Sequence, residues 1–154
     1  MKILLVHNYY RSGTPGGEDV VFEQEKRLLE SAGHEVVAYT RRNDEMNERN
    51  PLDVVRTIAG MRRSRRTRRE LTRLLRVQRP DIAHFHNIFP LISASAYEAC
   101  IAHRVPIVQT VHNYRHTCPI GIHYRNGTVC EACPPGKPWA AVTHRCYRAS
   151  WLAS

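Results

Sequence analysis

The alternation of elements that decides the fold begins in residues 3–40, ILLVHNYYRSGTPGGEDVVFEQEKRLLESAGHEVVAYT. Ile3–Val6 is a short uninterrupted apolar run, which is typical of a strand buried on both faces. A loop rich in glycine and proline follows, and then a predicted helix whose apolar face carries Val21, Phe22, Leu28, Leu29 and Ala32. Its charged residues are expected elsewhere on the helix, namely Glu23, Glu25, Lys26 and Glu30. Gly33 is expected to cap the helix, and residues 35–40 predict a second strand.

The same alternation continues along the chain. The expected elements are, in order, a loop at 41–50, a helix or broken pair of helices at 53–78 with Gly60 as the break, a strand at 81–86, a helix at 93–103 and a strand at 105–111. Residues 114–142 hold four prolines and few large aliphatic side chains, so a loop-like segment is expected there, followed by a helix at 143–154. Strands that alternate with helices predict an α/β domain with a doubly wound parallel sheet.

Three of the predicted strands are followed by a histidine–asparagine pair: His7-Asn8, His86-Asn87 and His112-Asn113. Ligands of open parallel sheets bind beyond the carboxyl ends of the strands, and both side chains donate and accept hydrogen bonds. The pairs therefore predict a site for a hydroxyl-rich ligand. The alternative is that they only bond loop groups at the strand ends. A metal site is less favoured because no carboxylate lies beside the histidines, although His84 and His86 are expected on one side of their strand.

Gly16 and Gly17 lie between the first strand and the first helix, where backbone N–H groups can face a phosphate. Glu18 and Asp19 begin the helix and would repel an anion docked directly on it. We therefore expect the glycines to permit close approach of a ligand, rather than the helix itself to cradle a phosphate. A plain tight turn is the alternative.

Four cysteines fall within 29 residues in the pattern Cys-x11-Cys-x2-Cys-x12-Cys: Cys118, Cys130, Cys133 and Cys146. In a reducing cytoplasm such clusters indicate a metal site more often than disulfides. A structural zinc contributes on the order of 10 kcal/mol, which a segment poor in apolar residues needs. We expect zinc on the four cysteines, with His116, His123 and His144 as substitutes. Free or paired cysteines and an iron–sulfur cluster remain alternatives. Four thiolates leave no open position, so no catalytic metal is expected.

The chain has 154 residues and a formal charge of +9, and residues 56–79, with ten arginines and one acid, account for all of it. One helical row carries Arg62, Arg66, Arg69, Arg73 and Arg76, with leucines largely opposite. Each basic residue near an anionic membrane contributes about 1 kcal/mol, so this row is predicted to face a membrane. The alternatives are a solvated face and a nucleic-acid site, which the lack of interleaved aromatic residues disfavours.

The sequence contains neither an apolar run of roughly 20 residues nor a signal-peptide core. The expected location is therefore the cytoplasm, with peripheral contact at the inner membrane face. Cys100, among alanines, is expected to be a buried apolar residue.

Four segments closely resemble the N-terminal domain of family 4 glycosyltransferases of the GT-B fold: LLVHNYY, PGGEDVVFEQEKRLLESAGHEVVAYT, RPDIAHFHNIFPLISASAYEAC and VPIVQTVHNYRHTCP. The resemblance runs from residue 1 to about residue 150 and is greatest to a bacterial subgroup with a cysteine-bearing insert. It implies a Rossmann-like domain on the acceptor side, with residues 114–146 as the insert. It also implies transfer of a sugar from a nucleotide-sugar donor, with retention of configuration and no catalytic metal, to acceptors that are often lipid-linked.

The same resemblance implies roles for individual residues. Gly16 and Gly17 come near the donor diphosphate, His112 reaches the transferred sugar, and His86 and Asn87 line the cleft. Asn8 and Asn113 complete the predicted rim of the ligand site, which the three histidine–asparagine pairs form at the carboxyl ends of the strands. The E-x7-E element of the donor-binding domain is not in the sequence, so the chain is expected to be the N-terminal half and inactive alone. The alternative function is a non-enzymatic, zinc-stabilised α/β module that binds anionic polymers such as nucleic acid.

Overall fold

The computed structural model describes the whole chain except residues 48, 116, 134–136, 138, 148 and 152–154 and the side chain of Arg62. It divides into two compact units, Met1–Thr110 and Val111–Ser154. No helix in the described part of the chain combines the length and the apolar character needed to cross a bilayer.

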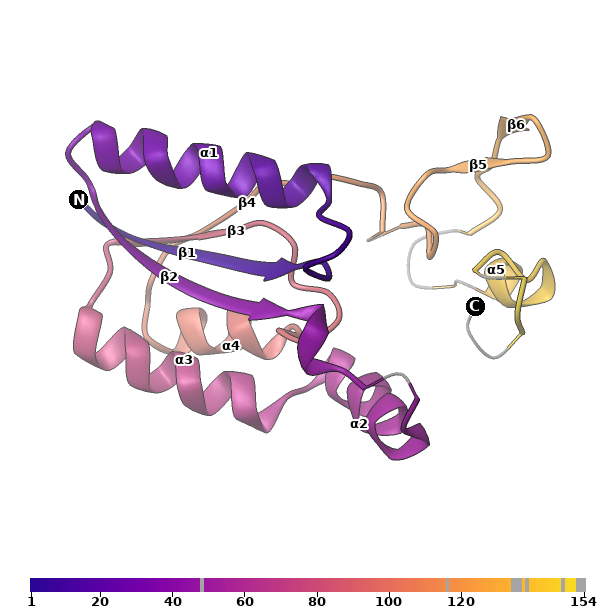
Figure 1. Cartoon of the computed structure of the whole chain (residues 1–154), viewed down its shortest axis with the longest axis horizontal. Helices are drawn as coiled ribbons and strands as arrows, with labels where there is room; N and C mark the ends of the chain where they lie inside the picture. Colours follow the sequence, from indigo (N-terminus) through magenta and orange to yellow (C-terminus); the bar gives the residue numbers. More distant parts are fainter. Residues whose placement is uncertain (48, 116, 134–136, 138, 148, 152–154) are drawn as a thin grey trace. The chain divides into compact units, whose positions relative to one another are not determined.

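The first unit is built on a four-stranded parallel sheet with the order β2-β1-β3-β4. Its strands are β1 (Lys2–Tyr9), β2 (Glu35–Arg42), β3 (Ile82–Phe85) and β4 (Ile107–Gln109). Helix α1 (Gly17–Ser31) covers one face, and α3 (Arg65–Gln78) and α4 (Ser95–Ala102) cover the other (Figure 1). The predicted α/β fold with a doubly wound parallel sheet is therefore confirmed.

The core has two unequal halves on either side of the sheet. On the α3 and α4 side, Leu4, Val6 and Phe85 of the sheet pack against Leu71 and Leu75 of α3. On the α1 side, the buried apolar residues are Ile3, Leu5 and Phe22. Because successive residues of β1 enter opposite halves, its central six residues are all buried. The apolar run Ile3–Val6 predicts this burial for the first four of them.

Helix α1 ends as predicted but is rotated from its predicted orientation. Gly33 has a φ of +81°, and the N–H of His34 donates to Leu29 O, which closes the last turn. Val21 and Leu28 are 41% and 65% exposed, whereas Phe22 is buried, so the predicted apolar face was wrong in part. The buried face instead includes Asp19, which has polar partners on the sheet side.

The arginine-rich segment forms two helices, α2 (Pro51–Arg62) and α3, but the break is not at Gly60, which lies inside α2. Ser64 makes the break because its side chain caps α3, accepting from the N–H of Thr67 at 3.2 Å. The predicted single row of arginines was therefore wrong at one position: Arg62 ends α2, and its side chain lies outside the described residues. The row on α3 contains Arg66, Arg69, Arg73 and Arg76.

Several predicted boundaries shift by a few residues. Strand β2 continues to Arg42, and a short 3-10 helix, η1 (Asn43–Glu45), occupies part of the predicted loop. Strand β4 is shorter than the predicted 105–111, since the residues paired with β3 are 107–109.

The second unit holds a two-stranded antiparallel hairpin, β5 (Tyr124–Arg125) and β6 (Thr128–Val129), and the short helix α5 (Trp139–Thr143). Its turn residues Asn126 and Gly127 both have positive φ, 52° and 83°, as a tight hairpin turn requires. The predicted helix at 143–154 was wrong, since residues 144–147 form turns and α5 lies earlier in the chain. Residues 148 and 152–154 of that prediction lie outside the described residues.

Candidate functional site

The carboxyl ends of β1 and β3 bring two of the three predicted histidine–asparagine pairs together. Val6 of β1 is in register with Phe85 of β3, so His7 and His86 follow at neighbouring positions, with ring centroids 6.0 Å apart. Both histidines and Asn8 are buried. His112 and Asn113 belong to the second unit.

His7 is held by Asp19, at the beginning of α1. Its Nε2 lies 2.8 Å from Asp19 Oδ1, and its ring stacks on Phe22 with centroids 4.7 Å apart. The same carboxylate accepts from the backbone N–H of Tyr10 at 3.3 Å and of Gly16 at 3.1 Å. An anion of the protein itself therefore occupies the Gly16 N–H of this loop.

Gly16 is required by packing, whereas Gly17 is not. A Cβ at Gly16 would lie 2.5 Å from the Tyr10 ring, and one at Gly17 would meet nothing within 4 Å. Tyr10 thus fills the space where a side chain at position 16 would lie, and the approach of a ligand to the glycine pair stays a prediction.

The side chains of Asn8 and Asn87 hold the loops around the strand ends. Asn8 donates from Nδ2 to Asn43 Oδ1 at 2.8 Å and accepts at Oδ1 from the N–H of Leu91 at 3.2 Å. Asn87 donates to the carbonyl of Asn8 and accepts from the N–H of Phe89. These bonds fit the alternative interpretation, in which the asparagines bond loop groups at the strand ends.

A carboxylate does lie beside the strand histidines, contrary to the sequence-based expectation. Glu25 of α1 places Oε1 2.6 Å from His84 Nδ1 and Oε2 3.4 Å from His86 Nε2. The expectation was wrong because Glu25 lies three residues after Phe22 and so shares its buried face, 59 residues away from His84 in the chain. The repeat Asp19, Phe22, Glu25 at three-residue spacing is the signal that could have revealed it.

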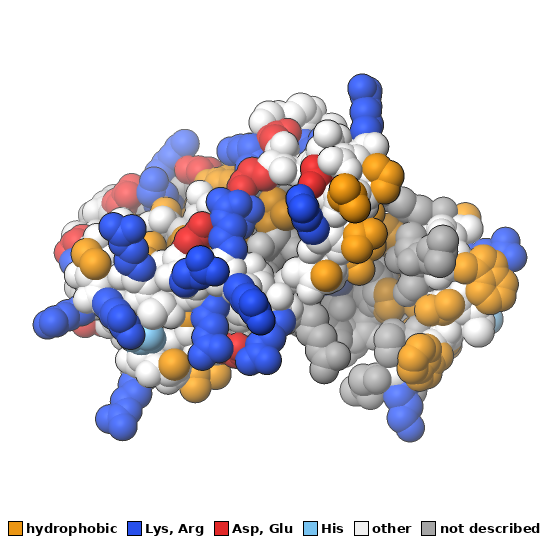
Figure 2. Space-filling model, turned by 90° about the horizontal axis from the view of Figure 1, so that it is seen from below, with side chains coloured by type: hydrophobic (Ala, Val, Ile, Leu, Met, Phe, Trp, Pro, Cys, Tyr) orange, Lys and Arg blue, Asp and Glu red, His pale blue; other side chains and the backbone are white. Residues whose placement is uncertain are grey.

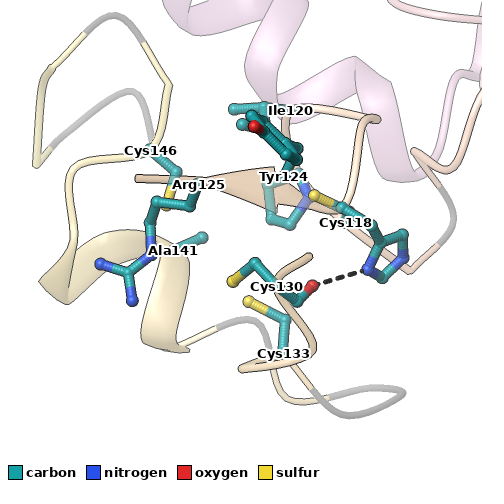
Figure 3. A pocket seen from close by; sticks show the side chains of 10 residues that line it. Cys118, Ile120, Tyr124, Arg125, Cys130, Cys133, Ala141 and Cys146 are labelled. Atoms are coloured by element: carbon teal, nitrogen blue, oxygen red, sulfur yellow. Dashed lines mark hydrogen bonds between the residues drawn. The ribbon is translucent and has the colours of Figure 1, made fainter. Parts of the chain in front are cut away.

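The four cysteines of the second unit line one pocket. Figure 3 shows Cys130 and Cys133 beside each other, with Cys118 and Cys146 on opposite sides. Ala141 is buried beside them, and the Arg125 side chain also lines the pocket. Among the described residues, no three cysteine sulfurs lie as close together as the ligand atoms of Glu25, His84 and His86, which are all within 4.8 Å. Metal binding by all four cysteines would therefore draw them inward.

The predicted substitute histidines are placed differently from the cysteines. His123 uses Nδ1 toward the carbonyl of Cys130 at 3.0 Å and Nε2 toward Thr117 Oγ1 at 2.7 Å. His144 is exposed and does not line the pocket, and His116 lies outside the described residues. Within the described part of the chain, the ligand groups that line the pocket are therefore the four cysteines and His123, whose two ring nitrogens already have partners.

Two of these thiols have pKa values below the ordinary thiol value. Burial raises the pKa of Cys118, but hydrogen bonds from the backbone N–H groups of residues 120–123 outweigh it. At Cys130 the backbone N–H of Ala132 and the Arg125 guanidinium lower the pKa. Burial raises the pKa of Cys146. The pocket therefore favours the thiolate form at Cys118 and Cys130, which is the form that binds metals.

Cys100 is separate from these cysteines and lies in the core of the first unit. It is fully buried on α4, as predicted, and burial raises the pKa of its thiol to about 11.

The outer face of α3 is basic. Leu71 and Leu75 are buried, and the arginines of the row on α3 are exposed on the other side of the helix. Arg66 pairs with Glu70 at 2.8 Å. Figure 2 shows basic side chains spread over this face, with apolar side chains exposed beside them. On α2, Leu52, Val55 and Ile58 are 58–66% exposed at three-residue spacing.

The family model described as Glycosyltransferase Family 4 matches residues 15–148. The chain belongs to glycosyltransferase family 4. Comparisons with curated proteins and with solved structures find no match. Glycosyltransferase domains in general have two kinds of substrate, a sugar donor and an acceptor. The matched range includes the Gly16-Gly17 loop, the strand-end residues of β3 and the four cysteines.

Proposed function

We propose that this domain is the acceptor-side domain of a retaining glycosyltransferase, which moves a sugar from a nucleotide-sugar donor to a glycan or lipid-linked acceptor. The family match over residues 15–148 is the observation that carries the proposal. The parallel sheet supports it, because ligands of such sheets bind beyond the carboxyl ends of the strands. The cysteine pocket fits a subgroup with an insert after the TVHNYR segment.

In this proposal the site residues of each unit have distinct tasks. His112, followed by Asn113, contacts the transferred sugar and stabilises charge at the reaction centre. The Gly16-Gly17 loop approaches the donor diphosphate, and Asp19 keeps that loop in one shape through the Gly16 N–H. His86 is buried beneath the ligand site, and the hydrogen bonds of Asn8 and Asn87 hold the loops around it in place.

The proposal extends to the membrane surface. On α2 the exposed apolar side chains Leu52, Val55 and Ile58 provide area for insertion among acyl chains. On α3 the basic side chains Arg69 and Arg73 are exposed for anionic headgroups, each contributing about 1 kcal/mol. Apolar and basic groups on consecutive helices are the combination that a peripheral membrane protein uses, and they would hold the enzyme where lipid-linked acceptors are found.

We also propose a structural zinc ion on the cysteines of the second unit. Support comes from the pocket that all four line and from the lowered pKa values of Cys118 and Cys130. Much of this unit is exposed, including Trp139 and Val129, so apolar burial alone stabilises it weakly. A metal cross-link would supply the missing free energy, on the order of 10 kcal/mol.

The proposed reaction is tested by measuring transfer from a panel of radiolabelled nucleotide sugars to a membrane lipid extract, using the complete product of the gene that encodes this chain. His112→Ala is expected to lower kcat at least about 100-fold, as for loss of a group that stabilises the transition state. His103→Ala, on α4's C-terminal cap, is the matched control and is expected to keep full activity. The product linkage should keep the donor's anomeric configuration. Absence of transfer from every donor, or inversion of configuration, would overturn the proposal.

A further inference from the structure

We propose that Glu25, His84 and His86 form a binding site for a divalent transition-metal ion in the first unit. Two imidazoles and one carboxylate are the ligand set that holds Zn²⁺ or Fe²⁺ at many protein sites. The ligand atoms of these three residues lie within 4.8 Å of one another. This site involves none of the cysteines and none of the residues to which a substrate role is assigned, except His86.

The distances within the group fit shared coordination. Metal–nitrogen and metal–oxygen bonds of about 2.0–2.1 Å place neighbouring ligand atoms about 3 Å apart. Glu25 Oε1 lies 2.6 Å from His84 Nδ1, and Oε2 lies 3.4 Å from His86 Nε2. An ion would take the place of the proton between Glu25 and His84, with a small outward movement of the carboxylate.

The ring of His84 already has the second partner that a metal-bound histidine needs. Its Nε2 lies 2.8 Å from Thr110 Oγ1, a hydroxyl that can accept a hydrogen bond from Nε2–H while Nδ1 binds the ion. The ring of His86 packs at nearly a right angle to the ring of Phe22, with centroids 5.3 Å apart. Both imidazoles are therefore oriented before any ion arrives, which lowers the entropic cost of binding.

The exposure of the three side chains gives the ion a path from solvent. His86 is fully buried, whereas the side chains of His84 and Glu25 are 15% and 25% exposed. Three protein ligands leave at least one position for water or for a ligand oxygen. Because Glu25 belongs to α1 and the histidines to the end of β3, the ion would tie the helix to the sheet beside the rim.

Cobalt(II) titration of the full chain, followed by absorption and by equilibrium dialysis, tests this inference. Cobalt on the cysteines gives an intense sulfur-to-metal charge-transfer band, whereas cobalt on imidazole and carboxylate gives only weak visible bands. We expect one ion per chain without the sulfur band, in addition to any ion on the cysteines. That ion should persist in Cys130→Ser.

Four variants separate the metal site from a purely structural hydrogen-bond network. Glu25→Gln and His84→Ala are expected to weaken binding of the sulfur-free cobalt at least tenfold, and Thr110→Val about tenfold or more. Glu23→Gln, on the same helix, is the matched control and should bind like the wild type. Glu25→Gln keeps the size and hydrogen-bonding ability of the side chain, so it decides the outcome if His84→Ala fails to fold. Equal binding by wild type and Glu25→Gln, or no sulfur-free cobalt at millimolar concentration, would overturn the inference.

Discussion

Replacing Asp19 by alanine is expected to destabilise the first unit more than any other single change at a charged residue of α1. The carboxylate is 6% exposed and accepts from three groups: His7 Nε2 and the backbone N–H groups of Tyr10 and Gly16. A buried donor that loses its acceptor costs about 1–3 kcal/mol, which applies in full to His7, while the part-buried N–H groups of Tyr10 and Gly16 cost less. Relief from burying a carboxylate offsets part of this cost. The net loss in the free energy of unfolding is therefore about 2–4 kcal/mol.

That loss is large beside the total stability of a domain, about 5–15 kcal/mol. For a protein of this size it corresponds to a decrease in Tm of roughly 10 °C. The assay is thermal and urea unfolding followed by circular dichroism. Glu30→Ala, an exposed acid at the other end of α1, is the matched control and should change stability by less than about 0.5 kcal/mol. A loss below about 1 kcal/mol for Asp19→Ala would refute the reasoning, since it would mean that the three donors find other acceptors at little cost.

Three further perturbations test other parts of the structure. Gly16→Ala should lower Tm by several degrees in thermal unfolding, because its Cβ would lie 2.5 Å from the Tyr10 ring, whereas Gly17→Ala should leave Tm unchanged. The double change Arg69→Glu with Arg73→Glu should reduce flotation with anionic vesicles at least tenfold, because it reverses two charges that each contribute about 1 kcal/mol to membrane binding. Unchanged flotation, or loss of DNA binding instead, would contradict the membrane role. Metal analysis of the purified chain should find zinc that Cys130→Ser or a chelator removes. Its removal should also lower the protease resistance of the second unit. A metal content that Cys130→Ser does not alter would contradict the cysteine site.

The sheet and its helices could be predicted because their signals are local. The apolar run at Ile3–Val6 and the glycine at position 33 each determine a strand or a helix end within a few residues of chain. The period of α3 could also be recognised, since its leucines lie opposite the row of Arg66, Arg69, Arg73 and Arg76. The break before α3 was missed although Ser64 carries a helix-capping signal, because Gly60 competes as a breaker in the same segment.

The arrangement of the site could be predicted only in outline. That His7 and His86 lie at the same edge of the sheet follows from the parallel strands that the alternation of elements predicts, whereas their direct proximity depends on the strand order of the structure. The partners Asp19 and Glu25 were not assigned despite their three-residue spacing from Phe22, because acids on a helix are expected in solvent unless a specific cation or donor faces them. Those donors come from β1 and β3, and only the packing of α1 on the sheet brings the acids to them.

The two faces of the sheet differ in the chemistry that holds their helices. On the α3 and α4 side an extensive apolar core stabilises the fold without reference to any ligand. On the α1 side the apolar part is small, and near the strand ends its place is taken by His7 with Asp19 and by His84 with Glu25. Polar contacts in a buried place are stable only when the geometry satisfies each donor and acceptor. The position of α1, and with it the Gly16-Gly17 loop at its beginning, is therefore set by hydrogen bonds at the same edge of the sheet where a sugar-transfer site is proposed. An ion at Glu25, or loss of the Asp19 carboxylate, would act on that loop through the helix rather than by direct contact with substrate.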